Sequence, residues 1–451
     1  MSRFSVGSAR RSRHVRAALA SLALLGACRT AERTGKPNRE PAERLLRDIA
    51  YLADDRLEGR GTGTAGNDSA AAWLARRHAS LGLRPLERDT TRAECRSALA
   101  PAACRGFLQR FTARGVELAH AGRPDGVATQ NVVALVPGRD PSLAGEYVVV
   151  GGHFDHLGRS PASALDPEAR DAIRNGADDN ASGTAAVLEL ARLFAAQPAR
   201  RSILLVHFSG EELGLLGSQW FVEHSPVALD SIAAMVNFDM VGRLRLERLI
   251  VYGVGTAQEL PALLDSANVA PKLRISAVRD GFGPSDHSSF YAKGIPVLHF
   301  FTDLHDDYHR ATDDVAKINA TGEARVVALA ERVVRAIADR PARLTAVRVA
   351  AAPSTSPSRE GSAVYLGTIP DMGSSDVPGL KLTGVRAGSP ADAGGLMAGD
   401  VIVELGGKPV KDLYSYSDAL YSHQPGDVVA IGYLRNGTRR ATSVTLATRA
   451  R

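Results

Sequence analysis

Cysteine is scarce in this chain, with only three among 451 residues. Two of them, Cys95 and Cys104, flank a stretch rich in alanine and proline, which suits neither a metal-binding knuckle nor a catalytic nucleophile. In an oxidising compartment these two cysteines could close a small surface loop, and otherwise they are idle thiols. The cysteines therefore do not indicate a thiol-based site.

Long hydrophobic runs are also missing after residue 28, since none approaches the roughly 20 apolar residues of a membrane-spanning helix. The apolar run 17–25 is too short to span and follows an arginine-rich start, which is typical of a cleaved export signal. Residues 25–28, Leu-Gly-Ala-Cys, resemble the bacterial lipobox. We therefore expect a protein of the bacterial cell envelope, periplasmic or extracellular, lipid-anchored at Cys28. Simple secretion, or export by a twin-arginine signal at Arg10-Arg11, are the alternatives.

The chain also has little excess of positive over negative charge outside its first 28 residues. The formal net charge is +6, but five arginines precede residue 28 with no acid among them, and about +1 remains without that segment. The basic balance therefore indicates neither a nucleic-acid partner nor a membrane surface. The composition, 44% hydrophobic and 23% charged, is that of an ordinary globular protein long enough for two domains.

The order of apolar patterns predicts the domains. After a signal over 1–28, residues 29–40 are polar and suit a tether, and residues 41–346 alternate strand-like and helical patterns. This alternation predicts an α/β domain with a mixed, mostly parallel sheet between helices. Residues 347–361 are rich in alanine, serine and proline and form the predicted linker to a smaller β-rich domain over 362–449.

Several elements can be placed within the larger domain. Helices are predicted at 42–52, 67–81, 182–196 and 319–339, where apolar residues recur with helical spacing. Residues 213–223 and 257–267 follow the same alternation. Two strands, 106–112 and 131–136, are expected to form an edge hairpin.

Four apolar runs with the character of buried strands are each followed closely by histidine or acidic residues. In open parallel α/β sheets, ligands bind outside the carboxyl ends of the strands, so these side chains are expected to converge. Asp179, at the entrance of a predicted helix, lies close to the same crevice. Histidine and carboxylate are zinc ligands, and the sequence therefore predicts a metal site. The residues following the four strands are His153, Glu211 with Glu212, Asp239, and Tyr308 with His309.

The motifs around these residues resemble the signature of the co-catalytic zinc exopeptidases of the bacterial leucyl aminopeptidase and glutamate carboxypeptidase II family. The resemblance covers roughly residues 41–346. The motifs are His153-x-Asp155, Asp179 within Gly-Ala-Asp-Asp-Asn-Ala-Ser-Gly, Glu211-Glu212, Asp239 within Asn-Phe-Asp-Met, and His309.

The resemblance implies two zinc ions per chain and a role for each residue. One ion would be held by His153, Asp179 and Asp239, and the other by Asp179, Glu212 and His309. Glu211 would be the general base that activates a metal-bridging water, and Asp155 would orient His153.

Other residues near these motifs are assigned less directly. His309 is followed by Arg310-Ala311 where the family frequently has Thr-Pro, although Asp313 is retained. The segment Ser285-Asp286-His287 resembles one found near the family's active site, so the predicted substrate pocket contains Asp286, His287 and Tyr308. Four further histidines are expected to be structural: His156, His207, His299 and His305.

Four functions remain open. The leading one is an aminopeptidase that removes N-terminal residues from peptides. A carboxypeptidase or dipeptidase is the second. Glutaminyl cyclisation uses the same fold with one zinc ion, and the full set of ligands argues against it. A non-catalytic interaction protein is the fourth, but relatives that became receptors lose ligands, whereas all five are present here.

The second domain resembles bacterial PDZ domains over residues 382–407. Residues Leu366, Gly367, Thr368 and Ile369 occupy the place of the family's carboxylate-binding loop. The resemblance implies that protein C-termini bind there as an added strand. A PDZ fold that serves only as a spacer or packing partner is the alternative.

Overall fold

The computed structural model describes residues 39–88, 105–114, 118, 123, 125–160, 164, 166, 169, 171–349, 364–370, 379–385, 388–411, 415–416, 419–420 and 422–448. The predicted export signal with Cys28, the tether up to residue 38, most of the linker, and both Cys95 and Cys104 lie outside these residues. Among the helices of the described part, none has both the length and the apolar character needed to cross a membrane.

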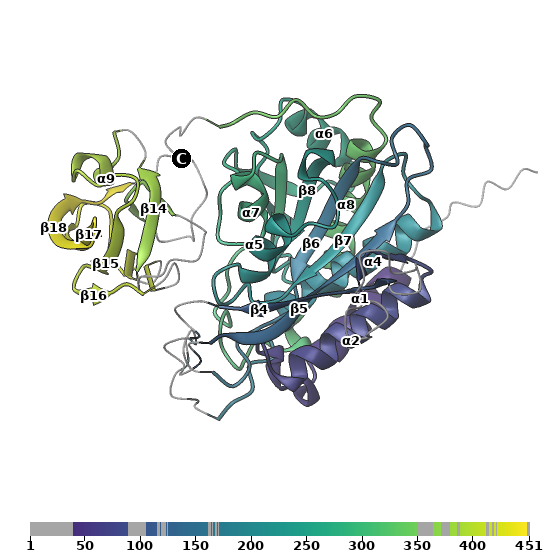
Figure 1. Ribbon diagram of the computed structural model, residues 1–451, viewed down its shortest axis with the longest axis horizontal. Coiled ribbons are helices and arrows are strands. Elements are labelled where there is room, and N and C mark those ends of the chain that lie inside the picture. Colours follow the sequence, from purple (N-terminus) through teal and green to yellow (C-terminus); the bar gives the residue numbers. More distant parts are fainter. Residues whose placement is uncertain are drawn as a thin grey trace, which may run out of the picture. The chain divides into compact units, whose positions relative to one another are not determined.

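The first domain is built on a mixed sheet, with nine strands in the described part of the chain (Figure 1). Their order is β1-β5-β7-β6-β8-β11-β9-β10, and β4 pairs with β5. The strands are β1 (Arg84–Pro85), β4 (Leu108–Ala113), β5 (Val127–Val136), β6 (Tyr147–His153), β7 (Ser202–Phe208), β8 (Ile232–Phe238), β9 (Arg248–Tyr252), β10 (Arg274–Ala277) and β11 (Val297–Phe301). Strands β2 (Glu87–Arg88) and β3 (Arg105–Gly106) form a separate pair.

The centre of the sheet consists of four parallel neighbours, β7, β6, β8 and β11. Strands β7 and β8 are buried along their whole length, which explains why they are apolar apart from Ser202, His207 and Asn237. The register places His153 beside Phe208 at the ends of β6 and β7. The carboxyl ends of the four strands therefore lie at one edge of the sheet.

Helices cover both faces of this sheet. On one face, α4 and α8 pack with α1, α2 and α6 against alternate strand residues such as Val148 and Val150. On the other face, Phe221 of α5 and Phe290 of α7 pack against residues such as Val149. The helices are α1 (Arg39–Leu52), α2 (Ala65–Ser80), α4 (Gly183–Ala196), α5 (Leu216–Glu223), α6 (Leu260–Ala267), α7 (His287–Ala292) and α8 (Ala320–Ala338). The predicted α/β fold class is thus confirmed.

Shorter elements complete this domain. Residues Asp55–Arg60, Leu229–Ser231 and Val315–Lys317 form single tight helical turns, and Ala177–Ser182 forms a wide turn that leads into α4. Backbone hydrogen bonds hold the chain against this domain as far as residue 349. Val347 donates its N–H to the Thr256 carbonyl, and Val349 donates its N–H to the Tyr291 hydroxyl oxygen.

The PDZ-like domain has a hydrophobic core of its own, which includes Leu380, Ile402 and Ile431. Its strands are β12 (Val364–Tyr365), β13 (Thr368–Pro370), β14 (Leu380–Val385), β15 (Val401–Leu405), β16 (Lys408–Pro409), β17 (Val428–Arg435), β18 (Thr438–Thr445) and β19 (Ala447–Thr448), with the short helix α9 (Pro390–Ala393). The predicted small β-rich second domain is therefore present.

The predicted carboxylate loop, residues 366–369, follows β12 and includes the first two residues of β13. Gly367 has a left-handed φ of 88°, and a Cβ there would meet Ser389 at 2.1 Å, so this position requires glycine. The Leu366 carbonyl accepts the N–H of Ala391 at 2.9 Å. The loop is thus held against the start of α9.

Candidate metal centre

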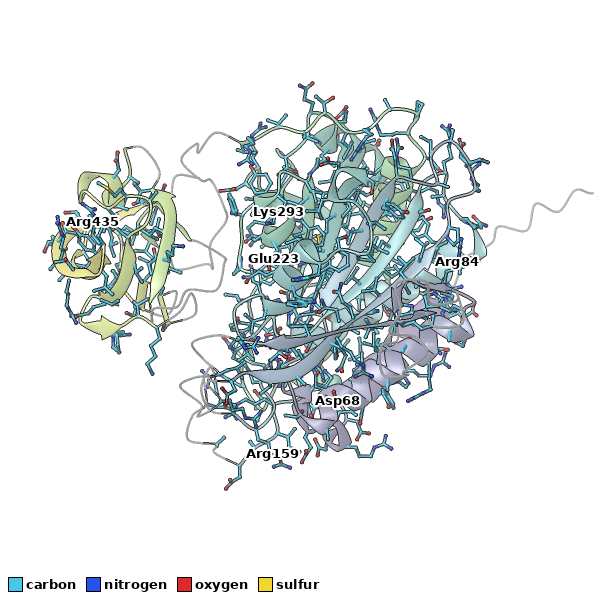
Figure 2. The ribbon with its side chains drawn as sticks, in the orientation of Figure 1. Asp68, Arg84, Arg159, Glu223, Lys293 and Arg435 are labelled. Atoms are coloured by element: carbon cyan, nitrogen blue, oxygen red, sulfur yellow. The ribbon has the colours of Figure 1, made fainter. Side chains whose placement is uncertain are left out.

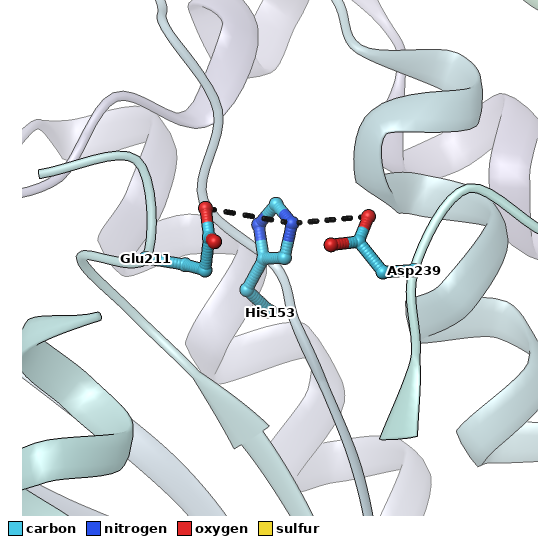
Figure 3. A group of neighbouring side chains, drawn as sticks. All are labelled: His153, Glu211 and Asp239. Carbon is cyan, nitrogen blue, oxygen red and sulfur yellow. Dashed lines mark ion pairs between the residues drawn. The ribbon is translucent and has the colours of Figure 1, made fainter. Parts of the chain in front are cut away.

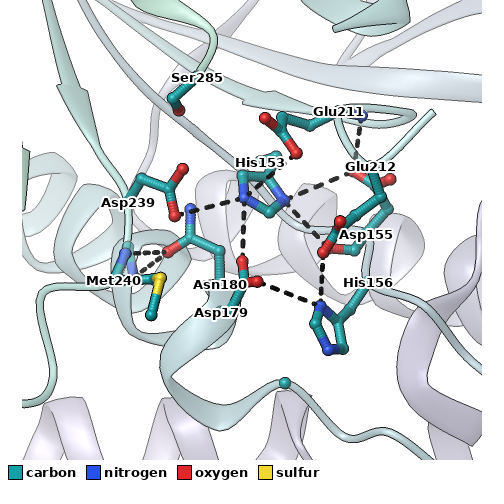
Figure 4. Close-up of polar contacts among 12 residues, drawn as sticks. His153, Asp155, His156, Asp179, Asn180, Glu211, Glu212, Asp239, Met240 and Ser285 are labelled. Carbon is teal, nitrogen blue, oxygen red and sulfur yellow. Dashed lines mark hydrogen bonds and ion pairs between the residues drawn. The ribbon is translucent and has the colours of Figure 1, made fainter. Parts of the chain in front are cut away.

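Each of the four central strands delivers an acidic residue or a histidine to one crevice. His153 is the last residue of β6, and Asp239 directly follows β8. Glu211 and Glu212 lie in the turn after β7, and His309 lies in the loop after β11. Figures 3 and 4 show His153 at the centre of this group, with Glu211 and Asp239 on either side.

The five predicted ligands come together around Asp179. Its Oδ1 atom lies 3.4 Å from His153 Nε2, which in turn lies 3.5 Å from Asp239 Oδ1. Its Oδ2 atom lies 3.2 Å from His309 Nε2, and the same nitrogen is 3.2 Å from Glu212 Oε2. The two oxygens of Asp179 therefore face two separate groups of donor atoms.

The donor atoms suit a metal ion better than they suit one another. His153 Nε2, Glu212 Oε2 and Asp239 Oδ1 are buried and have no hydrogen-bond partner within the described part of the chain. Two atoms that each lie about 2.1 Å from one tetrahedral zinc ion are about 3.4 Å apart, close to the separations found here. Histidine nitrogens with carboxylate oxygens are also the donor set that zinc accepts.

Glu211 lies close enough to the five predicted ligands to be considered as a further ligand. Its Oε2 atom is 3.8 Å from His153 Nε2 (Figure 3). Donor atoms of His153, Glu211 and Asp239 all lie within 4.8 Å of one another, and so do donor atoms of His153, Asp179 and Glu212. Distance alone therefore leaves Glu211 as either a ligand or a neighbouring base.

The electrostatics of the crevice favour a cation. Burial opposes the charged form of His153, but the negative charges of Glu211 and Asp239 outweigh it and raise the pKa of this histidine well above its usual value. The pKa of Asp179 is held well below its usual value, because the contacts with His153 and His309 outweigh its burial. A bound metal would displace the protons of these histidines and take over the pairing with the acids.

The surroundings of Glu211 favour its protonated form. Burial raises the pKa of its carboxyl group well above the usual value, and the charges of Glu212 and Asp239 add to this effect, against the opposing influence of His153. A carboxylate with a raised pKa accepts protons more readily near neutral pH, as a general base must.

Asp155 contacts His153 mainly through its backbone. The Asp155 carbonyl oxygen lies 3.1 Å from His153 Nδ1, whereas its carboxylate Oδ1 is 3.7 Å away. The carboxylate itself accepts a hydrogen bond from the Thr62 hydroxyl at 2.8 Å and from the Glu211 N–H at 3.2 Å. Asp155 thus links the loops of His153 and Glu211.

Neighbouring residues brace the turn that carries Asp179. Asp313 Oδ2 accepts the N–H groups of Asp178 at 2.9 Å and Asp179 at 3.0 Å, which connects this turn to the His309 loop. The Asp179–Asn180 peptide bond is cis. The Asn180 side chain donates to the Phe238 carbonyl at 2.9 Å. It also accepts the Met240 N–H at 3.2 Å (Figure 4).

Three supporting residues were not assigned to the site from the sequence. His156 Nδ1 lies 2.6 Å from Glu212 Oε1. Thr62 bonds to Asp155, and the buried Arg60 donates to the carbonyls of Leu52, Phe154, Asn175 and Gly176. Only His156 left a signal in the sequence, since it stands one residue after Asp155.

A pocket adjoins the candidate metal centre. It is a small pocket that is partly open to solvent. Tyr308 lines this pocket, whereas Asp286 and His287 are fully buried behind its wall. Its lining residues are Asp179, Glu211, Glu212, Asp239, Met240, Tyr252, Pro284, His299, Phe301, Leu304, Tyr308 and His309.

The other predicted structural histidines are paired inside the domain. His207 Nε2 lies 3.0 Å from His78 Nε2, and His305 Nε2 lies 3.1 Å from Asp178 Oδ2. His299 stacks on His287 at 4.4 Å.

A mixed α/β sheet with histidine and carboxylate donors at its carboxyl edge defines a candidate metallohydrolase domain. Comparison with known proteins identifies it further. Residues 131–334 match the model of peptidase family M28, and residues 361–446 match that of the PDZ domain. The chain therefore contains an M28 peptidase domain followed by a PDZ domain, as the sequence motifs predicted.

Curated relatives are similar over part of their length. A probable zinc metalloprotease of Pyrenophora tritici-repentis is 40% identical over 119 residues, which are 26% of this chain and 25% of that protein. Aminopeptidase YwaD of Bacillus subtilis is 31% identical over 189 residues, 39% of this chain and 37% of the relative. The chain thus spans about a quarter to somewhat over a third of these two proteins.

Solved structures share the fold. A zinc aminopeptidase from Bacillus subtilis superposes with a TM-score of 0.50 at 17% identity, covering 67% of this chain and 98% of that structure. A glutaminyl cyclase from Bacteroides thetaiotaomicron also superposes with a TM-score of 0.50, at 16% identity over 65% and 97% of the two chains. The fold alone therefore does not separate peptidase from cyclase.

Proposed function

We propose that this protein is a zinc-dependent aminopeptidase that hydrolyses the first peptide bond of peptide substrates. The observation that carries the proposal is the position of Asp179, whose two carboxylate oxygens face two groups of donor atoms. The M28 family match and the relative described as an aminopeptidase support the same reaction.

The ligands are assigned by their contacts. His153, Asp179 and Asp239 would hold one zinc ion, and Asp179, Glu212 and His309 the other, with Asp179 shared. When bound, the zinc ions would lower the pKa of a coordinated water and polarise the substrate carbonyl.

Glu211 is assigned as the general base. Its carboxylate lies at the pocket wall, 3.8 Å from His153 Nε2, and burial raises its pKa, which makes it a stronger proton acceptor than an exposed carboxylate. It would take the proton of the attacking water and pass it to the leaving amine. Asp155 and Thr62 would hold the Glu211 turn through the contact of the Asp155 carboxylate with the Glu211 N–H.

A substrate panel tests the reaction. The zinc-loaded full chain is incubated with aminoacyl amides, N-blocked peptides and C-terminally amidated peptides. An aminopeptidase cleaves the first and third groups and leaves the N-blocked peptides intact. Cleavage that instead requires a free carboxylate would support the carboxypeptidase alternative. Conversion of N-terminal glutamine to pyroglutamate without hydrolysis would support the cyclase.

Metal analysis tests the cofactor separately. We expect up to two zinc ions per chain after reconstitution and dialysis, which elemental analysis against protein concentration measures. A value of zero would remove the mechanism, and a firm value of one would remove the bridging role of Asp179.

The location is proposed from the sequence, because the relevant residues are not described by the structure. We propose a lipid anchor at Cys28 in the bacterial cell envelope. Replacing Cys28 with serine should move the protein from membrane fractions to soluble fractions, as immunoblotting shows. Soluble unaltered protein would contradict the anchor.

The PDZ domain is proposed to bind protein C-termini at residues 366–369. The glycine at 367 and the contact of Leu366 with α9 shape a loop suited to this role. A peptide array with free and amidated C-termini tests it. Binding that does not require the free carboxylate would contradict this mode of recognition, and the absence of any binding would support the spacer alternative.

A further inference from the structure

His299 occupies an unusual position for a histidine. It is the third residue of β11, a central strand, and it lies in register with Asn237 of β8 and Tyr252 of β9. Its side chain is only 3% exposed, yet it lines the pocket beside the candidate metal centre. A polar ring is therefore built into a pocket wall that is otherwise largely apolar on this side.

The hydrogen bond to Asn237 determines which ring nitrogen carries the proton. The Asn237 amide donates to the Ser285 hydroxyl oxygen at 2.8 Å and to His299 Nδ1 at 3.2 Å. A nitrogen that accepts a hydrogen bond carries no hydrogen, so the proton of the His299 ring is on Nε2. Since Nδ1 faces Asn237, Nε2 is the ring's remaining polar atom and acts as a donor.

Neighbouring rings hold this donor in a fixed orientation. His299 stacks on His287 with centroids 4.4 Å apart and an angle of 9°. The ring centroid of Tyr252 lies 5.4 Å from that of His299, and the ring centroid of Phe301 lies 5.9 Å from it. A donor held this rigidly loses little conformational freedom when a ligand binds, and it can therefore contribute to specificity.

The rest of this wall limits what the donor can bind. Met240, Pro284, Phe301 and Leu304 are apolar, and neither lysine nor arginine is among the described residues that line the pocket. A carboxylate side chain would find no cation on this wall. An apolar side chain would fill the space but would leave the Nε2–H group without an acceptor, which is unfavourable in a buried site.

We propose that His299 determines the specificity of the site by donating from Nε2 to the side-chain oxygen of an N-terminal asparagine or glutamine. The proposal rests on the proposed aminopeptidase function and adds the substrate class. A neutral carboxamide supplies the acceptor oxygen and an uncharged chain that fits against the apolar wall. A site built to hydrogen-bond a substrate group discriminates strongly against analogues that lack it.

Product binding tests this assignment without turnover. Calorimetry on the zinc-loaded full chain compares L-glutamine, L-norleucine and L-glutamate, which differ in the side chain. We expect glutamine to bind about tenfold more tightly than norleucine, and glutamate more weakly than glutamine. Equal or tighter binding of norleucine by the unaltered protein would overturn the proposal.

The variant His299→Phe keeps the aromatic ring and removes the donor. The glutamine-to-norleucine preference should fall about tenfold, and the kcat/KM ratio for the corresponding aminoacyl amides should fall by the same factor. His224→Phe, the same substitution at an exposed histidine outside the pocket, should change neither ratio. An unchanged preference in a folded His299→Phe protein would also overturn the proposal.

The two hypotheses fail in different ways. If no amide is hydrolysed, the aminopeptidase function is wrong, and the binding ratio still decides the role of His299. If amides are hydrolysed without any preference for the carboxamide, the function stands and the assignment of His299 is wrong. If His299→Phe does not fold, the comparison of glutamine with norleucine in the unaltered protein decides.

Discussion

His156 Nδ1 lies 2.6 Å from Glu212 Oε1, so a histidine outside the predicted ligand set makes a direct contact with a proposed zinc ligand. The same atom lies 3.8 Å from Asp179 Oδ2 (Figure 4). Hydrogen bonds to a ligating carboxylate fix its orientation and are part of what determines metal affinity. The structure thus gives His156 a supporting role in the metal centre.

Replacing His156 with phenylalanine should weaken zinc binding. The ring volume is retained, but Glu212 loses its hydrogen bond, and we expect the zinc affinity to fall about 10- to 100-fold. Competition with a fluorescent chelator measures it, and His224→Phe serves as the control for a histidine replaced at an exposed position. Zinc affinity equal to that of the unaltered protein would show that the contact does not support the ligand.

Glu211→Gln should separate metal binding from catalysis. Glutamine keeps the size of the side chain but cannot accept the proton, so kcat should fall about 10²- to 10⁴-fold. Zinc content should remain near normal, which elemental analysis of the same sample checks. A marked loss of zinc would instead identify Glu211 as a ligand, which its 3.8 Å distance from His153 Nε2 permits.

A matched control for this variant is available on the surface. Glu223, at the end of α5, is exposed (Figure 2). Glu223→Gln removes the same charge away from the crevice and should leave both kcat and zinc content unchanged. A loss of activity in both variants would indicate a general effect of charge.

Arg60→Leu should destabilise the peptidase domain. The buried guanidinium donates to four carbonyl groups, those of Leu52, Phe154, Asn175 and Gly176, and leucine leaves all of them without this donor. Loss of such a buried network is expected to lower the free energy of unfolding by about 3–5 kcal/mol. Thermal unfolding measures it, and Arg159→Leu at an exposed position is the control. An unchanged melting temperature would contradict the structural role of Arg60.

The buried pair of His78 and His207 should make the domain sensitive to acid. Burial lowers the pKa of His78 to about 3 and that of His207 well below its usual value. In the unfolded chain the pKa is about 6.5, so below that pH the unfolded state binds protons that the folded state excludes. The free energy of unfolding should therefore decrease as the pH decreases. For His78 alone the decrease is about 2 kcal/mol at pH 5, relative to a pH well above 6.5.

The double variant His78→Leu with His207→Leu tests the cause of this sensitivity. Urea unfolding at pH 7 and pH 5 should show a smaller loss of stability than in the unaltered protein, by about 2 kcal/mol or more. The comparison is made on zinc-free samples, so that both proteins share the titration of the metal ligands. Equal losses in the two proteins would assign the acid sensitivity to other groups.

Local pattern accounts for what the sequence predicted well. The strands β6, β7 and β8 are buried on both faces, so most of their residues are apolar and the runs can be recognised. The helix predicted over 182–196 is observed as Gly183–Ala196, because an amphipathic helix repeats its apolar residues at a fixed spacing. Parallel strands then place the residues that follow them at one edge.

Some boundaries depended on contacts with other parts of the chain. Strand β5 begins at Val127 rather than at 131, because β4 supplies hydrogen-bond partners for residues that are not apolar enough to mark a strand. Helix α5 begins at Leu216 rather than at 213, after Gly214 and Leu215 adopt a left-handed conformation. Neither feature has a local signal in the pattern of apolar residues.

The sequence by itself determined the α/β class, the PDZ domain and the residues able to bind metal, because short-range periodicity and motif spacing carry that information. Only the tertiary structure decided which partners the other histidines contact. His156 follows shortly after β6 and contacts Glu212, His207 lies in β7 and pairs with His78, and His299 lies in β11 and lines the pocket. Their partners lie far away in the sequence, and only the packing of strands and loops brings them into hydrogen-bonding distance.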